Sequence, residues 1–106
     1  MARPTTASTP HHADERLLSP FLDAHGRFRR WPVRPAKRDL ALHRLARLFA
    51  AGTDYRERDV NVILGAAHTF GDATMLRRAL CDAGLLARTD DGTRYWKPAE
   101  AAEVES

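Results

Sequence analysis

The segment that most limits how this chain can fold is residues 76–96, where an amphipathic helix leads directly into a β-hairpin. Four apolar residues recur at helical spacing and predict a buried stripe: Leu76, Ala79, Leu80 and Ala83. Gly84 predicts the end of the helix, because glycine readily takes the left-handed conformation that closes many helices. The opposite side of this helix carries the polar residues and is expected to face outward: Thr74, Arg77, Arg78 and Cys81.

The hairpin is predicted by two strand-like runs, residues 85–89 and 93–97, that flank the dipeptide Asp91-Gly92. This dipeptide is a strong signal for a two-residue turn, since both central positions of such a turn need a positive φ. Pro98 is expected to end the sheet, because proline has no N–H to donate. The predicted register pairs Ala87 with Trp96 and Arg88 with Tyr95.

Two further amphipathic helices precede this unit, over residues 36–50 and 56–67. Their apolar stripes are Ala41, Leu42, Leu45, Leu48 and Phe49 in the first, and Val60, Ile63, Leu64 and Ala67 in the second. Between them, Tyr55 is expected to add a third strand to the hairpin. The order of elements predicts an α+β fold, a small winged helix-turn-helix with three helices and a short antiparallel wing sheet.

A helix and strand extension is expected before the three helices. Ser19-Pro20 predicts the start of a short helix, since serine caps helices and proline suits the first helical position. Phe28 and Trp31 are expected to anchor the extended piece that follows to the core. The predicted organisation is a disordered N-terminal arm (residues 1–16), a single winged-helix-like domain (17–98) and an acidic C-terminal tail (99–106).

Three motifs resemble those of a small prokaryotic family, domain of unknown function 2087. They are Tyr-x-Glu-x-x-Val-Asn from Tyr55 to Asn61, Leu-Arg-Arg from Leu76 to Arg78, and Arg-x-x-x-Gly-x-x-Tyr-Trp from Arg88 to Trp96. The resemblance covers about residues 21–98. Members occur alone or fused to helix-turn-helix transcriptional regulators, so the resemblance implies a role near transcription without an assigned activity. The chain departs from the family at Arg56, where a hydroxyl residue often caps the second helix.

Positive charge is concentrated in residues 27–47, where eight basic residues face one acidic residue and the net charge is +7. The whole chain carries only +3 at pH 7. On a DNA duplex this segment would contact phosphates without regard to base sequence. The residues expected to do so are Arg29, Arg30, Lys37 and Arg44. The alternative is an ordinary solvated surface, which charged runs often form.

The third helix is expected to read double-stranded DNA by placing Thr74, Arg77 and Arg78 in the major groove. Arginine binds guanine edges through two hydrogen bonds, or else grips phosphates. The alternative is that one of the two arginines pairs with an acid inside the fold, such as Asp72, Asp82 or Glu57. Arg77 is the candidate for that role, since it lies near the edge of the buried stripe.

Some residues of the hairpin favour DNA binding and others oppose it. Arg88 and Arg94 flank its tip and are expected to touch phosphates. The tip itself contains Asp90 and Asp91, whereas a tip that enters the minor groove normally carries arginine or lysine.

No pattern typical of an enzyme, a metal site or a cofactor site is present in the sequence. His25, His43 and His68 are scattered, and no cysteine or carboxylate spacing suits zinc. The adjacent His11 and His12 have no converging ligands. Glycine-rich phosphate loops are absent and Ser19 has no His–Asp partners. We therefore expect a protein that is not an enzyme and needs no cofactor.

Cys81 is the only cysteine, so no disulfide can form within the chain and a reducing, cytoplasmic location is expected. A redox role on the outward helix face is conceivable, but an inert thiol is the simpler interpretation. No apolar run approaches the roughly 18 residues of a membrane span, so no membrane partner is expected.

The expected function is double-stranded DNA binding in transcriptional regulation. The alternative is a non-catalytic module for dimerisation or for binding a regulator protein, since one fold can serve both roles. The acidic hairpin tip favours the alternative, whereas the arginine pair and the basic segment favour DNA.

Overall fold

The computed structural model describes residues 16–98. Apart from Arg16, the predicted N-terminal arm lies outside the described residues, and so does the predicted acidic tail. The elements in chain order are the 3-10 helix η1 (Ser19–Phe21), α2 (Pro35–Ala46), β1 (Asp54–Tyr55), α3 (Glu57–Gly65), α4 (Ala73–Asp82), β2 (Ala87–Arg88) and β3 (Tyr95–Trp96).

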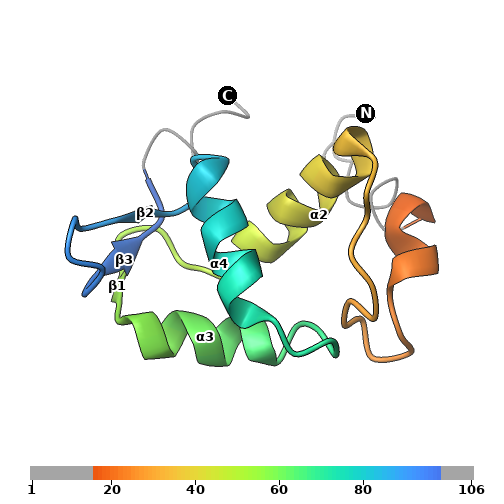
Figure 1. Ribbon diagram of the computed structural model, residues 1–106, viewed down its shortest axis with the longest axis horizontal. Coiled ribbons are helices and arrows are strands. Elements are labelled where there is room, and N and C mark those ends of the chain that lie inside the picture. Colours follow the sequence, from red (N-terminus) through yellow and green to blue (C-terminus); the bar gives the residue numbers. More distant parts are fainter. Residues whose placement is uncertain (1–15, 99–106) are drawn as a thin grey trace, which may run out of the picture.

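The fold is α+β, with a three-stranded antiparallel sheet at one end of the helical body (Figure 1). The strand order is β1-β3-β2, so β1 lies on the outer edge of the hairpin. α4 packs against both α3 and α2, and the N-terminal segment with η1 lies at the end opposite the sheet. This order of helix, strand, two helices and hairpin is compatible with the predicted winged helix.

The predicted hairpin register is confirmed, since Ala87 pairs with Trp96 and Arg88 with Tyr95. The predicted third strand also forms and sets Tyr55 opposite Tyr95. The loop, however, is longer than two residues. The last cross-strand bond runs from the N–H of Thr89 to the carbonyl of Arg94 (3.0 Å), and the N–H of Gly92 donates back to the carbonyl of Thr89 (3.0 Å). Residues 90–93 therefore form the loop, and Gly92 supplies a left-handed residue at φ 73°.

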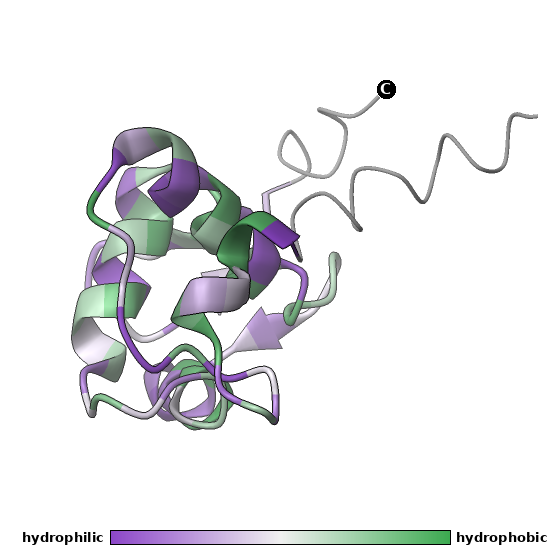
Figure 2. Ribbon diagram, turned by 90° about the vertical axis from the view of Figure 1, so that its right-hand side faces the viewer, coloured by the Kyte–Doolittle hydropathy of each residue, from purple (hydrophilic) through white to green (hydrophobic). Residues whose placement is uncertain are grey.

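One hydrophobic core joins the helices, the N-terminal segment and the sheet. Its buried residues include Leu18, Phe28, Ala41, Leu45, Val60, Leu64, Leu76, Leu80, Leu86 and Tyr95. Figure 2, which views the molecule from the end that carries the N-terminal segment, shows hydrophobic and hydrophilic bands alternating along the helices, as expected of amphipathic helices. The prediction for Leu48 is wrong: α2 ends at Ala46, and the Leu48 side chain beyond it is 48% exposed.

The helix starts differ in how they are capped. The carboxylate of Asp72 accepts the N–H of Met75 (3.1 Å) at the start of α4. Arg56 precedes α3, and its N–H donates to Asp59 (3.0 Å), so an acid in the first turn supplies part of the capping that a hydroxyl residue would provide. A short helical element begins at Ser19, as predicted, since the 3-10 helix η1 spans Ser19–Phe21 with Pro20 in its first turn. Residues 16–18 before it are also helical, and Leu18 rather than Ser19 is the N-cap.

Phe28 anchors the N-terminal segment, as predicted. Its side chain is 1% exposed, and its ring packs edge-on against Trp31 with 5.3 Å between centroids. Its backbone also pairs with the turn between α3 and α4: its N–H donates to the carbonyl of Ala67 and its carbonyl accepts the N–H of Thr69, both at 2.8 Å. The extension therefore holds the turn between α3 and α4 from outside.

His68 completes that turn from within, a role that the sequence analysis missed. The ring is buried, its Nδ1 lies 2.6 Å from the carbonyl of Leu64, and its Nε2 accepts the N–H of Asp72 at 2.9 Å. A carbonyl needs a donor and an N–H needs an acceptor, so these partners specify a neutral ring with the proton on Nδ1. His68 thus links the end of α3 to the first residues of α4.

Candidate nucleic-acid interface

The outward side of α4 carries three exposed residues at four-residue spacing: Thr74, Arg78 and Asp82. They line up because residues four apart lie one above another on a helix. Arg78 makes no hydrogen bond or ion pair with any residue between 16 and 98. Its guanidinium is therefore open to a ligand that docks on this face.

Arg77 does not share that face, contrary to the expectation that it would contact DNA. Its side chain is 12% exposed, its Nη2 lies 3.7 Å from Glu57 Oε2, and its Nη1 donates to Asn61 Oδ1 at 2.6 Å. Its guanidinium also lies over the Tyr95 ring, 5.9 Å from the centroid. Consecutive residues on a helix are rotated by about 100°, which is enough to turn Arg77 toward α3 while Arg78 faces outward.

The partners of Arg77 belong to the motifs that carry the family resemblance. Glu57 and Asn61 come from the first motif, and Tyr95 comes from the last. One cluster therefore joins α3, α4 and β3. The sequence analysis named Glu57 as a possible partner but missed Asn61 and Tyr95. The available signal was the four-residue spacing of Glu57 and Asn61, which places both on one helix face.

Cys81 is half-buried, so its predicted place on the exposed side of α4 is wrong. Burial raises the pKa of its thiol, although the positive charges of Arg88 and Arg77 act in the opposite direction. A thiol with a raised pKa supplies little thiolate at neutral pH and reacts slowly. The geometry thus supports an inert thiol.

Three residues of the basic segment hold the N-terminal extension. Arg29 Nη2 donates to the carbonyl of Pro20 (3.0 Å). The Arg30 guanidinium lies over the ring of Phe21 at 4.9 Å from the centroid, and the Lys37 ammonium lies over the same ring at 5.9 Å. These contacts are cation–π interactions. Arg29 and Arg30 remain exposed, so they serve the fold and can still meet phosphates.

Arg44 is tied to a turn of the extension. Its Nη2 donates to the carbonyl of Gly26 (3.3 Å), and Gly26 itself has a positive φ of 79°. The same turn is closed by Asp23, which accepts the backbone N–H groups of His25 (2.9 Å) and Arg27 (2.8 Å) and pairs with Arg27 Nε (2.9 Å). The backbone bond from Arg27 is the main cause that lowers the pKa of Asp23. Arg44 is partly buried in this arrangement and is not placed as a surface phosphate contact.

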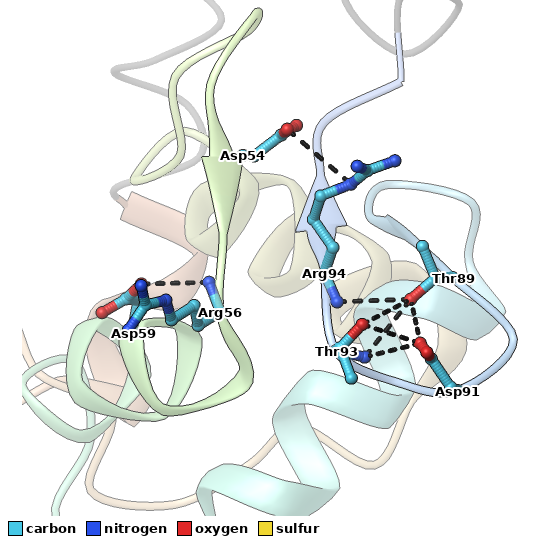
Figure 3. A network of polar contacts seen from close by, with 7 residues as sticks. All are labelled: Asp54, Arg56, Asp59, Thr89, Asp91, Thr93 and Arg94. Carbon is cyan, nitrogen blue, oxygen red and sulfur yellow. Dashed lines mark hydrogen bonds and ion pairs between the residues drawn. The ribbon is translucent and has the colours of Figure 1, made fainter.

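The hairpin loop is organised around the carboxylate of Asp91 (Figure 3). Its Oδ1 accepts the hydroxyls of Thr89 and Thr93, both at 2.7 Å, and the N–H of Thr93 at 3.1 Å. The two hydroxyl bonds are the largest causes that lower the pKa of Asp91. The four-residue loop follows from this network, because Asp91 bonds to residues on both sides of it.

Arg88 and Arg94 are both exposed at the base of the loop. Arg94 Nε lies 3.7 Å from Asp54 on β1, as Figure 3 shows, and its guanidinium lies over the ring of Trp96 at 5.5 Å from the centroid. Arg88 Nη1 makes only a long hydrogen bond of 3.4 Å to the carbonyl of Thr89. Arg88 is therefore the less constrained of the two.

Positive charge is not continuous over this side of the molecule. Asp72 and Asp82 lie with Arg78 around one shallow depression on α4, and Asp90 and Asp91 occupy the hairpin tip. Part of the basic segment belongs to the N-terminal extension, which lies at the opposite end from the sheet (Figure 1). The candidate face is therefore the outward side of α4 with Thr74 and Arg78, and Arg88 and Arg94 lie on the hairpin that follows this helix.

No metal site and no membrane-spanning helix is found within residues 16–98. No three histidine, cysteine, aspartate or glutamate side chains of this part gather where an ion could bind. None of its helices is long and apolar enough to cross a bilayer. His11 and His12 lie outside the described residues.

Comparison with known proteins gives one match. A family model described as "Uncharacterized protein conserved in bacteria (DUF2087)" matches residues 27–97, which span α2, β1, α3, α4 and the hairpin. No curated protein and no solved structure matches the chain.

Proposed function

The chain belongs to this DUF2087 family of bacterial proteins, and on that premise we propose that it binds double-stranded DNA in transcriptional regulation, with α4 as the reading helix. The observation that carries the proposal is the open face of α4. Thr74 and Arg78 are exposed there, and Arg78 has no partner among the described residues. The neighbouring hairpin adds Arg88 and Arg94.

Each residue of this face has a defined role in the proposal. Arg78 lies on the outer line of the helix and can bind a guanine edge through two hydrogen bonds or grip a phosphate. Thr74, in the first turn of α4, can reach a base edge or a phosphate. Arg88 and Arg94 contact the sugar-phosphate backbone. Arg29 and Arg30 add phosphate contacts only if the duplex extends toward the N-terminal extension.

Fluorescence anisotropy with labelled duplexes over a salt series tests the proposal. We expect Arg78→Ala to weaken binding by about 1–3 kcal/mol, because the variant has no charged donor to bind a base edge or a phosphate. The Arg29→Ala/Arg30→Ala double variant should lower the slope of log K against log salt by about one unit for each phosphate that the protein no longer neutralises.

Arg34→Ala is the matched control, since it removes one exposed charge just before α2 and away from the candidate face. Weak binding that is the same for the parent protein and every variant would reject α4 as the reader.

The second candidate is a non-catalytic module for dimerisation or for binding a regulator protein. It is favoured by Asp72 and Asp82 beside Arg78 and by Asp90 and Asp91 at the hairpin tip, since these acids would repel phosphates. Sedimentation velocity over a range of protein concentration separates the two. A dimer that Arg78→Glu dissociates, in a protein that does not bind duplexes, would support the second candidate.

A further inference from the structure

A pocket of about 450 Å³ opens where the turn of the N-terminal extension meets the C-terminal ends of α2 and α3. No residue of α4 or of the hairpin lines it, so it is separate from the candidate DNA face. Its volume falls within the roughly 300–1,000 Å³ that small-molecule sites occupy.

The wall of this pocket is mainly apolar. The residues that form it are Phe28, Leu45, Leu48, Ile63, Ala66 and Ala67. Leu48 is the side chain that the helical periodicity assigned to the core but that remains half exposed. A leucine exposed on a concave wall offers apolar surface that a ligand can remove from water, at roughly 25 cal/mol for each Å² covered.

The rim of the pocket is cationic. His25, Arg27, Arg44 and Arg47 line it, and none of the described aspartates or glutamates does. Arg27 already binds Asp23 and Arg44 already binds the Gly26 carbonyl. A guanidinium has five N–H donors, so each can keep its present contacts and also donate to an anion.

We propose that this pocket binds a small organic carboxylate with an apolar body. The carboxylate meets the arginine rim, and the body covers Leu48, Ile63 and Ala66. An inorganic anion has no surface to bury on the apolar wall, and a neutral apolar molecule makes no charge-assisted hydrogen bond at the rim. The charge of the rim and the character of the wall together select this class of ligand.

The pocket shares its wall with the turn that positions α4. Phe28 and Ala67 both line the pocket, and the bond between the Phe28 N–H and the Ala67 carbonyl (2.8 Å) joins them. The next residue, His68, holds the N–H of Asp72, the N-cap of α4. A ligand that packs against Phe28 and Ala67 stabilises this turn. The further step, from the turn to DNA affinity, rests on the proposed function.

Titration of the full chain with sodium octanoate, followed by two-dimensional ¹H–¹⁵N NMR, tests the proposal. We expect a Kd that is roughly millimolar or tighter for a ligand of this size. The largest shifts should fall on residues 25–28, 47–48 and 63–67, and the amides of Thr69 and Asp72 should exchange more slowly with solvent. Octanol, which lacks the charge, should bind roughly tenfold more weakly. Acetate, which lacks the apolar body and leaves the wall uncovered, should bind more than roughly tenfold more weakly.

Two variants separate the contributions of wall and rim. Ala66→Phe fills the pocket from the C-cap of α3, whose φ of −80° and ψ of −9° suit any residue, and should abolish octanoate binding. Arg47→Gln should weaken octanoate binding about tenfold and leave octanol binding unchanged, because it removes one charge-assisted hydrogen bond. Arg34→Gln, which removes a charge outside the pocket, is the matched control.

The proposal is overturned if octanoate does not bind, if its shifts map away from the pocket, or if both folded variants bind like the parent protein. Equal affinity for octanoate and octanol would overturn the carboxylate assignment. None of these measurements contains DNA, so their failure is distinct from a failure of the proposed function.

Discussion

Arg77 and Arg78 are neighbours in the chain with opposite surroundings. Arg77 is held by Asn61, Glu57 and the Tyr95 ring, whereas Arg78 is exposed and has no partner among residues 16–98. Two adjacent arginines therefore have different roles. Arg77 fastens α4 to α3 and the sheet, and Arg78 remains for a ligand.

At this scale we predict that Arg77→Ala lowers the free energy of unfolding by about 1–3 kcal/mol. The reason is that Asn61, which is partly buried, loses the donor to its side-chain oxygen. Arg78→Ala is the matched control and should change stability by no more than about 0.5 kcal/mol, as exposed substitutions usually do. Urea denaturation measures both. Equal effects of the two variants would contradict the assignment of Arg77 to the fold.

At the scale of elements, the strand pairing of the hairpin was predictable from the sequence, whereas the length of its loop depends on contacts between side chains. The alternation of its strands gave the register correctly, since a slip by one residue would move Tyr95 from the core to the surface. The loop differs from the expected two-residue turn because Thr89 and Thr93 both bond to the carboxylate of Asp91. Three polar side chains thus outweigh the turn preference of the Asp-Gly dipeptide.

This network predicts a pH dependence of the hairpin. The folded pKa of Asp91 is below its ordinary value of 3.8, so the ionised carboxylate stabilises the loop above that value. The contribution is lost as the pH falls through the lowered folded pKa. Carbon-13 NMR of the Asp91 carboxyl should report the low pKa, and Thr89→Val should raise it. Thr74→Val is the control, and a pKa that does not respond to Thr89→Val would refute the network.

For the molecule as a whole, one core joins parts that lie at opposite ends of the body. Leu18 and Phe28 from the extension belong to the same buried cluster as Leu86 and Tyr95 from the sheet end. The basic segment adds to this attachment, since Arg29 and Arg30 of the extension and Lys37 and Arg44 of α2 all contact residues of the extension. The extension is therefore an integral layer of the fold.

A single core predicts that the two ends unfold together. Trp31 reports on the extension and Trp96 on the sheet, so the variants Trp96→Phe and Trp31→Phe each leave one fluorophore. We expect the urea transition of Trp31 fluorescence in the first variant to coincide with that of helical circular dichroism in the same protein, and likewise for Trp96 in the second. An earlier Trp31 transition would show that the extension detaches separately.

Much of the fold was predictable from local pattern. Most residues of the buried stripes, the order of the elements, the three-stranded sheet and the anchoring by Phe28 follow from residue spacing and side-chain type, as does the family. These features depend on contacts within an element or between chain neighbours, which is why periodicity and turn chemistry indicate them. The predicted stripe residues Leu48 and Ala83 are instead exposed.

The tertiary structure alone decided which charged residues are available. Arg77 and Arg44 bond to residues of other segments, Cys81 packs against the core, and Leu48 lies on the wall of a pocket that three separate segments form. A residue near the edge of a buried stripe can face either way, and the packing of the neighbouring helix fixes its direction. Spacing specifies where a side chain sits on its own helix, but exposure depends on what packs against that helix.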